Sequence, residues 1–225
     1  MNTLLLLLLD TRAPAGAHHH SGGMEAAVST GLVAGLSDLE DFCQARLRTS
    51  ARVAAAFAAA ACHLQANFPE RAPWAELDAE FDARTPSAAM RAASRQLGGG
   101  LLRLLRSLQP EAALPWARGG RPAPHHPLVL GAGIHLAGGC PELAARAAAL
   151  AACAGPASAA VRLLGLDPFA VQAMLARLAP GIDDCARRAA KDATGPPSSL
   201  PADGAPALDL LADFHLTSEV RLFAS

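Results

Sequence analysis

The sequence is poor in the residues that build β-sheets, and this scarcity narrows the fold class. Only 4% of its 225 residues are aromatic, and tyrosine is absent. Alanine and leucine, both strong helix formers, are abundant instead. Hydrophobic residues make up 52% of the chain, a share that excludes intrinsic disorder for most of it. The composition therefore predicts an all-α fold, and the length suits a single compact multi-helix domain over residues 1–225.

The chain also lacks an excess of charge and a long apolar run. Nineteen basic and 20 acidic residues leave a net charge of -1, which offers no electrostatic footprint for nucleic acid or for a membrane surface. The run from Leu4 to Leu9 is shorter than the apolar region of a signal peptide, about 7–15 residues, and far below the roughly 20 residues that span a bilayer. We expect a cytoplasmic protein that binds neither nucleic acid nor a membrane.

The common catalytic motifs are missing. There is no P-loop, no G-x-S-x-G turn, no H-E-x-x-H pair and no calcium loop. Five cysteines lie far apart without a C-x-x-C pair, so we interpret them as small apolar residues in the helix cores of a reduced protein; they are Cys43, Cys62, Cys140, Cys153 and Cys185. The sequence predicts a protein that is not an enzyme, and we assign it no cofactor and no metal ligand.

Start signals and periodicity outline the helices. The capping box Ser37-Asp38-Leu39-Glu40 predicts a helix that runs to about Leu64. Thr85-Pro86 predicts the start of a second amphipathic helix, interrupted by Gly98-Gly99-Gly100, where either a kink or the close approach of another backbone is expected. Its predicted apolar stripe contains Met90, Ala93, Leu97, Leu101, Leu104 and Leu108.

The second half of the chain begins after a loop rich in Gly and Pro at 119–127. Apolar helices at 128–137, 141–153 and 156–166 are expected to form the central layer, with a break at Gly155-Pro156. Asp167-Pro168 predicts the start of the most regular helix. Residues 194–206 are predicted to be a flexible connector, and residues 207–225 a last helix and a tail.

Histidine is the one residue type that suggests a metal site. His18, His19 and His20 would form a cluster with His125 and His126 if the fold brought them together, and imidazole suits nickel, zinc, copper and iron. The alternative hypothesis is therefore a small helical metal-binding protein or metalloenzyme. The competing interpretation is a polar loop whose histidines cap or bridge neighbouring backbone.

The C-terminal end is the other unusual feature. Arg221 precedes the apolar pair Leu222 and Phe223 at a terminus of a kind that is usually frayed. The pair either folds back onto the core or anchors the chain in a pocket of a partner, since arginine and aromatic residues are frequent at the centres of interfaces.

Several segments resemble the signatures of the urease accessory protein UreF family. The family writes D-S-x-L-P-x-G followed by H-S-x-G-L-E, then S-R-Q-x-G, S-A-A-V-R-L and a terminal S-R-L-F-x-S. The chain has similar segments in the same order along almost its whole length; they begin at Asp10 and at His20, Ser94, Ser158 and Arg221.

The resemblance implies an all-helical, non-enzymatic chaperone that forms a homodimer. Such proteins join UreD (called UreH in some organisms) and the GTPase UreG and help to deliver nickel to apo-urease. By this resemblance the C-terminal tail, with Arg221, Leu222 and Phe223, seats in UreD. The dimer face would hold UreG near the turn formed by His20, Ser21, Gly22, Gly23 and Glu25.

Two arginines in the other matching segments are also candidate partner contacts. Arg95 lies in S-R-Q-L-G and Arg162 in S-A-A-V-R-L, and both are expected to be interface or helix-end residues rather than catalytic ones. Because the sequence has no nucleotide-binding loop, any GTP chemistry would belong to a partner.

Overall fold

The computed structural model describes residues 3–10, 20–69, 73–116 and 122–216, and within these ranges the chain forms helices and no strand. This confirms the all-α fold class. The elements are α1 (Thr3–Leu9), α2 (Met24–Ser29), α3 (Leu36–Arg48), α4 (Ser50–Asn67), α5 (Trp74–Ala83), α6 (Ala88–Leu108), α7 (His126–Leu136), α8 (Pro141–Leu164), α9 (Pro168–Asp192), the 3-10 turn η2 (Pro197–Ser199) and α10 (Pro206–Leu216).

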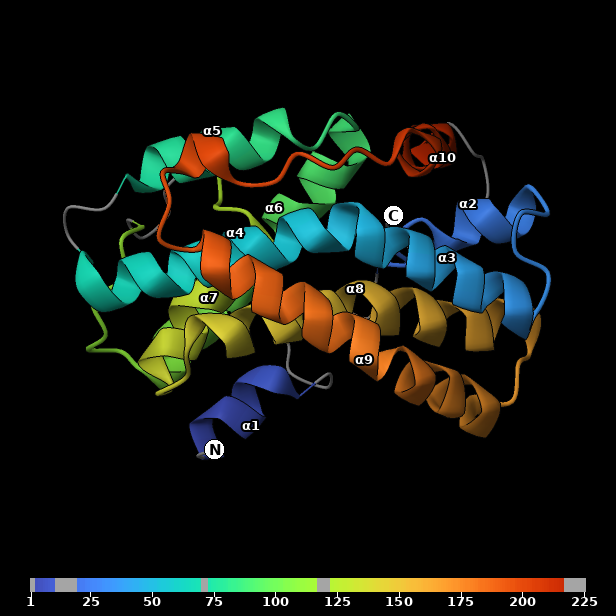
Figure 1. The fold of residues 1–225 in the computed structure, drawn as a ribbon, viewed down its shortest axis with the longest axis horizontal. Helices are drawn as coiled ribbons and strands as arrows, with labels where there is room; N and C mark the ends of the chain where they lie inside the picture. Colours follow the sequence, from blue (N-terminus) through green and yellow to red (C-terminus); the bar gives the residue numbers. More distant parts are fainter. Residues whose placement is uncertain (1–2, 11–19, 70–72, 117–121, 217–225) are drawn as a thin grey trace.

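Helix α4 lies at the centre and packs against α7, α8 and α9. In Figure 1, α3 and α4 follow one another across the middle of the molecule, α5 and α10 lie along the upper edge and α1 lies at the lower edge. Half of α4 is alanine, and small side chains let helices approach closely: a Cβ on Gly131 of α7 would lie 2.1 Å from the carbonyl oxygen of Ala58. The alanine-rich composition therefore serves tight helix packing.

The prediction of one helix from the capping box to Leu64 is wrong in two respects. The helix divides at Thr49, whose φ and ψ of -128° and -109° lie outside the helical region. It also begins at Leu36, after Gly35, without a side-chain cap. The carboxylate of Asp38 accepts the backbone N–H of Ala34 at 2.9 Å, so the bond at this helix start is made by a different residue from the one predicted.

The predicted break at Gly155-Pro156 is also wrong, because α8 continues through it. Proline has no N–H, so the carbonyl of Ala152, four residues earlier, loses its helical partner. The Nε of Arg46 donates a hydrogen bond to this carbonyl at 2.9 Å. A residue of another helix thus replaces the missing bond. By length and composition α8 could cross a membrane, but it packs against α4 and α9 as a core helix does.

The start of α9 is confirmed. The side chain of Asp167 accepts the backbone N–H of Phe169 at 3.0 Å, and Pro168 occupies the first turn. The predicted stripe is buried: Val171, Met174, Leu178, Ile182, Cys185 and Ala189. This helix could be predicted from sequence because its apolar residues recur at helical spacing and its cap lies directly before its first turn.

Helix α6 begins two residues later than predicted, and the residues that it buries differ from the predicted apolar stripe. Its cap is Ser87, whose Oγ accepts the N–H of Met90 at 3.2 Å and donates to Asp213 of α10 at 2.6 Å. The buried residues are Ala89, Gly98, Gly100, Leu101, Leu102 and Leu105, so the face toward the core includes two of the glycines.

The segment predicted as a flexible connector contains η2. The side chain of Arg84, the residue that follows α5, binds this segment. The guanidinium of Arg84 donates to the carbonyls of Ser198 and Leu200, at 3.0 and 3.2 Å, and to that of Pro201 at 3.1 Å. Leu200 is buried in the main core. The flexibility of this connector stays a prediction.

The cysteines follow the predicted pattern with one exception. Cys43, Cys62, Cys153 and Cys185 are free and buried, as expected of small apolar core residues. Cys140 is exposed, because it precedes the first turn of α8.

Candidate functional site

The H-S-G-G-M-E segment forms a tight turn that leads into α2. Gly22 and Gly23 have φ values of +61° and +87°, in the left-handed region that favours glycine. The Oγ of Ser21 accepts the backbone N–H of Glu25 at 3.3 Å. Ser21 is fully buried, and His20 and Glu25 are almost so. The turn is therefore part of the packed structure, and its two glycines are required by its conformation.

Arg46 of α3 joins this turn to α8. Its Nη1 donates to the carbonyl of Gly22 at 2.9 Å, and its Nε donates to the carbonyl of Ala152. A Cβ on Gly22 would lie 3.2 Å from Cγ of Pro156, so the turn rests directly on the proline of α8. Burial lowers the pKa of Arg46 from its usual value, although a guanidinium stays charged at neutral pH.

Sequence reasoning missed Arg46, although one signal was present. The residue lies three positions after Cys43, on the same side of the helix as Phe42 and Cys43, both buried. A cation on the apolar face of a helix requires buried acceptors, which here are the two carbonyls.

The S-R-Q-L-G segment of α6 holds a second backbone segment, the loop at 122–125. The Nη1 of Arg95 donates to the carbonyl of Ala123 at 2.7 Å. The Oγ of Ser94 accepts the N–H of His126 at 3.3 Å. A Cβ on Gly98 would lie 2.0 Å from the carbonyl oxygen of Pro124. Of the two explanations considered for the triple glycine, the close approach of another backbone is therefore confirmed at Gly98.

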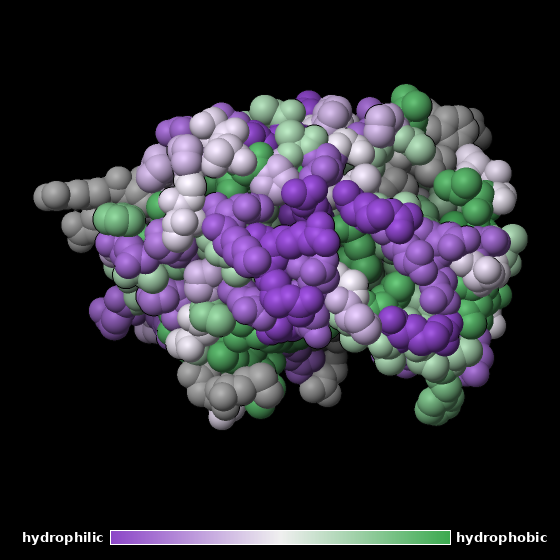
Figure 2. Space-filling model, viewed as in Figure 1, coloured by the Kyte–Doolittle hydropathy of each residue, from purple (hydrophilic) through white to green (hydrophobic). Residues whose placement is uncertain are grey.

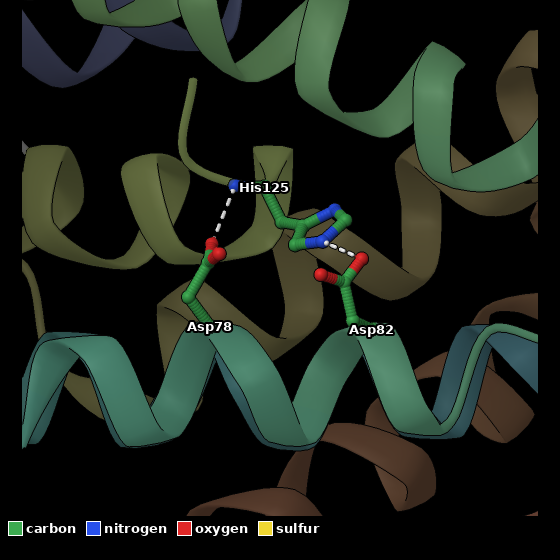
Figure 3. A group of neighbouring side chains, drawn as sticks. All are labelled: Asp78, Asp82 and His125. Carbon is green, nitrogen blue, oxygen red and sulfur yellow. Dashed lines mark hydrogen bonds and ion pairs between the residues drawn. The ribbon is translucent and has the colours of Figure 1, made fainter. Parts of the chain in front are cut away.

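Arg95 also pairs with two carboxylates of α5. Its Nη2 lies 2.8 Å from Oδ2 of Asp78 and 2.5 Å from Oδ2 of Asp82. The same carboxylates reach His125: Asp78 accepts its backbone N–H at 3.1 Å, and Asp82 lies 2.9 Å from its Nε2. Figure 3 shows both aspartates rising from one helix toward His125. We call Asp78, Asp82, Arg95 and His125 the loop-anchoring network.

The contacts of this network shift the pKa values of its members. Burial by itself raises the pKa of Asp82, but hydrogen bonds from Arg95 and His125 outweigh it and hold that pKa below its usual value. Burial lowers the pKa of His125, and the positive charge of Arg95 adds to the effect. His125 is thus neutral at pH 7, and only the tautomer with a proton on Nε2 can donate to Asp82.

Three of these residues have the chemistry of metal ligands. Ligand atoms of Asp78, Asp82 and His125 lie within 4.8 Å of one another. However, Arg95 already pairs with both carboxylates, and the Nε2 of His125 uses its proton toward Asp82. A metal ion would have to displace a guanidinium that bonds to both carboxylates. The arrangement fits an ion-pair network that holds a loop better than it fits a metal site.

The fold brings together part of the predicted histidine cluster. Burial and, to a smaller extent, the nearby charge of His20 together lower the pKa of His126 to about 4, so these two side chains lie close enough to interact electrostatically. His125 belongs to the loop-anchoring network instead. His18 and His19 lie outside the described residues. Within the described ranges, His20 and His126 belong to no group of three potential ligands.

The other candidate residues occupy separate places. Glu25 lies in the first turn of α2, and Arg162 is exposed in the last turn of α8, a helix-end position. Arg221, Leu222 and Phe223 lie outside the described residues. The partner contacts assigned to all of them stay predictions.

These features define a class of protein before any comparison. It is an all-α protein in which side chains of two helices hold backbone segments in place: Arg46 holds the turn at Gly22, and Ser94 and Arg95 hold the loop before α7. Comparison with known proteins then identifies the family. Residues 33–179 match the family model UreF, and the chain belongs to the UreF family of urease accessory proteins, which are not enzymes.

The curated relatives cover almost the whole chain. The chain is 43% identical to "Urease accessory protein UreF" of Mycobacterium sp. (strain JLS), over 99% of this chain and 98% of that protein. It is 43% identical to the protein of the same name from Mycolicibacterium vanbaalenii, over 98% and 97%, and 42% identical to that of Mycobacterium marinum, over 99% and 98%. The resemblance drawn from the sequence segments is confirmed.

Proposed function

We propose that this urease accessory protein is a soluble, cytoplasmic scaffold that joins UreD (UreH) and the GTPase UreG and helps to deliver nickel to apo-urease. It works as a homodimer and offers binding surfaces, while its partners carry out the GTP chemistry. Family membership over nearly the full length supports the role in urease maturation.

One observation carries the proposal beyond membership. Two signature segments far apart in the sequence are each bound to other parts of the structure: Arg46 and Pro156 contact the turn that begins at His20, and Ser94 of α6 accepts the N–H of His126. The charge of His20 in turn lowers the pKa of His126. Hydrogen bonds of this kind fix the positions of these segments relative to the helices, and a scaffold needs binding surfaces with a fixed shape. We assign the UreG contact to this turn, with Gly22, Gly23 and Glu25.

The UreD contact is assigned to the C-terminal end. Helix α10 is tied to α6 by the bond from Ser87 to Asp213, so the residues that follow α10 start from a fixed point. Those residues include Arg221, Leu222 and Phe223, an apolar pair beside a cation of the type that fills a partner's pocket.

The experiment is removal of residues 221–225, followed by co-purification with UreD. The shortened protein should keep its helical circular dichroism spectrum and lose UreD. Removal of Ala224 and Ser225 alone is the matched control and should retain UreD. Normal retention of UreD after the longer deletion would show that the tail does not form this contact.

The metal-binding alternative is supported by one observation, the proximity of His20 and His126. It requires a stoichiometric transition metal in the isolated protein, lost when His19 and His20 become alanine. Metal analysis of the purified protein separates the two functions: a metal-free protein that still binds UreD supports the scaffold.

A further inference from the structure

A groove of about 570 Å³ runs between α3 and α9, on a face remote from the loop-anchoring network. Figure 2 shows that hydrophilic side chains gather over the middle of this face, where Figure 1 shows α9 running diagonally below α3 and across the end of α4. The lining comes from the end of α3, the start of α4 and the middle of α9; its residues are Gln44, Leu47, Arg48, Arg52, Arg177, Leu178, Gly181, Asp184, Cys185 and Arg188.

The lining residues follow helical spacing, so the groove is a continuous channel along α9. Arg177, Gly181, Asp184 and Arg188 recur at steps of three and four and therefore share one face of the helix. At a rise of about 1.5 Å per residue, the distance from Arg177 to Arg188 is about 16 Å, or about three helical turns. Arginines thus stand at both ends of the channel.

The walls carry more positive than negative charge. Four lining residues are arginines, Arg48, Arg52, Arg177 and Arg188, and one, Asp184, is acidic. Asp184 is shared, since Arg187 lies 3.4 Å and Arg188 2.7 Å from its carboxylate.

The remaining arginines differ in their partners. Arg52 pairs with Asp203 at 3.1 Å and Arg177 with Glu40 at 2.6 Å, both at the surface. Arg48 is exposed and forms no ion pair within the described part of the chain. Because exposed ion pairs contribute about 0–1 kcal/mol, these arginines can exchange their present partners for carboxylates of a bound molecule.

The floor of the groove is apolar and open. Leu47, Leu178 and Cys185 line it. A Cβ on Gly181 would meet only Cδ1 of Leu47, at 3.6 Å, which is ordinary contact. Packing within the described part of the chain therefore does not require a glycine at this position. Because Gly181 has no side chain, the middle of the groove stays empty.

We propose that this groove binds an acidic amphipathic helix of a protein partner, about three turns long. Its carboxylates would pair with the arginines at the ends, and its apolar side chains would rest on Leu47 and Leu178. A net charge of -1 for the whole chain and an apolar floor favour a peptide over nucleic acid. The site goes beyond the proposed function, which assigns partners to the N-terminal turn and the tail.

The probe is a fluorescein-labelled synthetic helix in which Glu-Leu-Leu-Glu is repeated, with a second peptide that has Gln for every Glu. Fluorescence anisotropy on the full chain should show binding of the acidic helix in the micromolar range and at least tenfold weaker binding of the Gln peptide. A labelled uridine oligonucleotide is measured in parallel. Failure to bind the acidic helix, or tighter binding of the oligonucleotide, overturns the proposal.

Two independent variants locate the binding. The double substitution Arg48→Glu with Arg188→Glu should weaken binding at least tenfold, and Gly181→Leu should do the same by filling the groove, without a change of charge. Arg103→Glu on α6 is the matched control, since Arg103 is equally exposed and α6 packs on α7 and α10. Equal loss in the control, or none with Gly181→Leu in a folded protein, would contradict binding in the groove.

Discussion

A buried and a half-buried arginine hold backbone segments in this protein, and they do so in different electrostatic settings. Arg46 bonds to the carbonyls of Gly22 and Ala152, whereas Arg95 bonds to the carbonyl of Ala123 and to the carboxylates of Asp78 and Asp82. Burial lowers the pKa of Arg46; burial also acts to lower that of Arg95, but hydrogen bonds with the two aspartates raise it overall.

The junctions made by Arg46 and by Arg95 therefore depend on different interactions. At the Arg46 junction a cation compensates a defect of the backbone, the carbonyl that Pro156 leaves free, and its removal leaves two carbonyls without a donor. At the Arg95 junction the partners are charged and partly exposed, so water can take over part of the interaction. The first junction should be more sensitive to mutation and the second more sensitive to pH.

The largest effect should follow Arg46→Ala. Two charge-assisted hydrogen bonds are lost, each worth about 1.5–3 kcal/mol, so we expect the free energy of unfolding to fall by about 3–4 kcal/mol in urea titration. Arg48→Ala, two residues further on and exposed, is the matched control and should change it by less than about 0.5 kcal/mol. A loss below about 1 kcal/mol for Arg46→Ala would show that the carbonyls find other donors.

A smaller effect is expected for Gly98→Ala at the Arg95 junction. The new Cβ would lie 2.0 Å from the carbonyl oxygen of Pro124, so the loop must move, and overpacking of this kind costs about 1–3 kcal/mol. Gly155→Ala in α8 is the control, because its Cβ would meet nothing within 4 Å. Thermal unfolding should show a lower Tm for the first variant and an unchanged or higher Tm for the second. Equal Tm values would mean that the loop yields freely.

The smallest effect at neutral pH should follow Arg95→Gln, about 1–2 kcal/mol, since the carboxylates it leaves are partly hydrated. Its signature is the pH dependence. The pKa of Asp82 in the folded protein lies below the ordinary 3.8, so this carboxylate stabilises the fold above that pH and the contribution is lost as pH falls through the folded pKa.

Urea titrations between pH 3 and pH 7 test this dependence. The wild-type protein should lose more stability on acidification than Arg95→Gln does, so the two curves should converge at low pH. Parallel curves would mean that Arg95 does not determine the ionisation of Asp82.

Sequence patterns were reliable where the interaction is local. The periodicity of α9 and its cap at Asp167 involve residues within a few positions of each other, and both are confirmed. The cap predicted at Thr85 was wrong because Ser87, two residues further on, makes the same kind of bond; at Ser37 no side chain caps the helix, and Asp38 accepts the N–H of Ala34 instead. In both cases the error is a choice between close alternatives in sequence.

The candidate site was predictable only in part, because Asp78, Asp82 and Arg46 were not among the residues that the sequence indicated. Its turn at Gly22-Gly23 and the glycine at 98 stand out in sequence, since few residues tolerate a positive φ or so close a backbone. Arg46 was missed, because its acceptors belong to a turn 24 residues before it and a helix 106 residues after it.

By itself the sequence determined the helical class, the amphipathic face of α9 and, through five segments in a fixed order, the UreF family. The helical class and the amphipathic face depend on composition and on spacings of three or four residues, and the chain has both before it folds. Only the tertiary structure decided that α8 passes through Pro156, that Arg46 reaches the turn at Gly22, and that α3 and α9 enclose a groove lined by arginines. Such contacts join residues far apart in the chain, and the packing of whole helices alone brings them within reach.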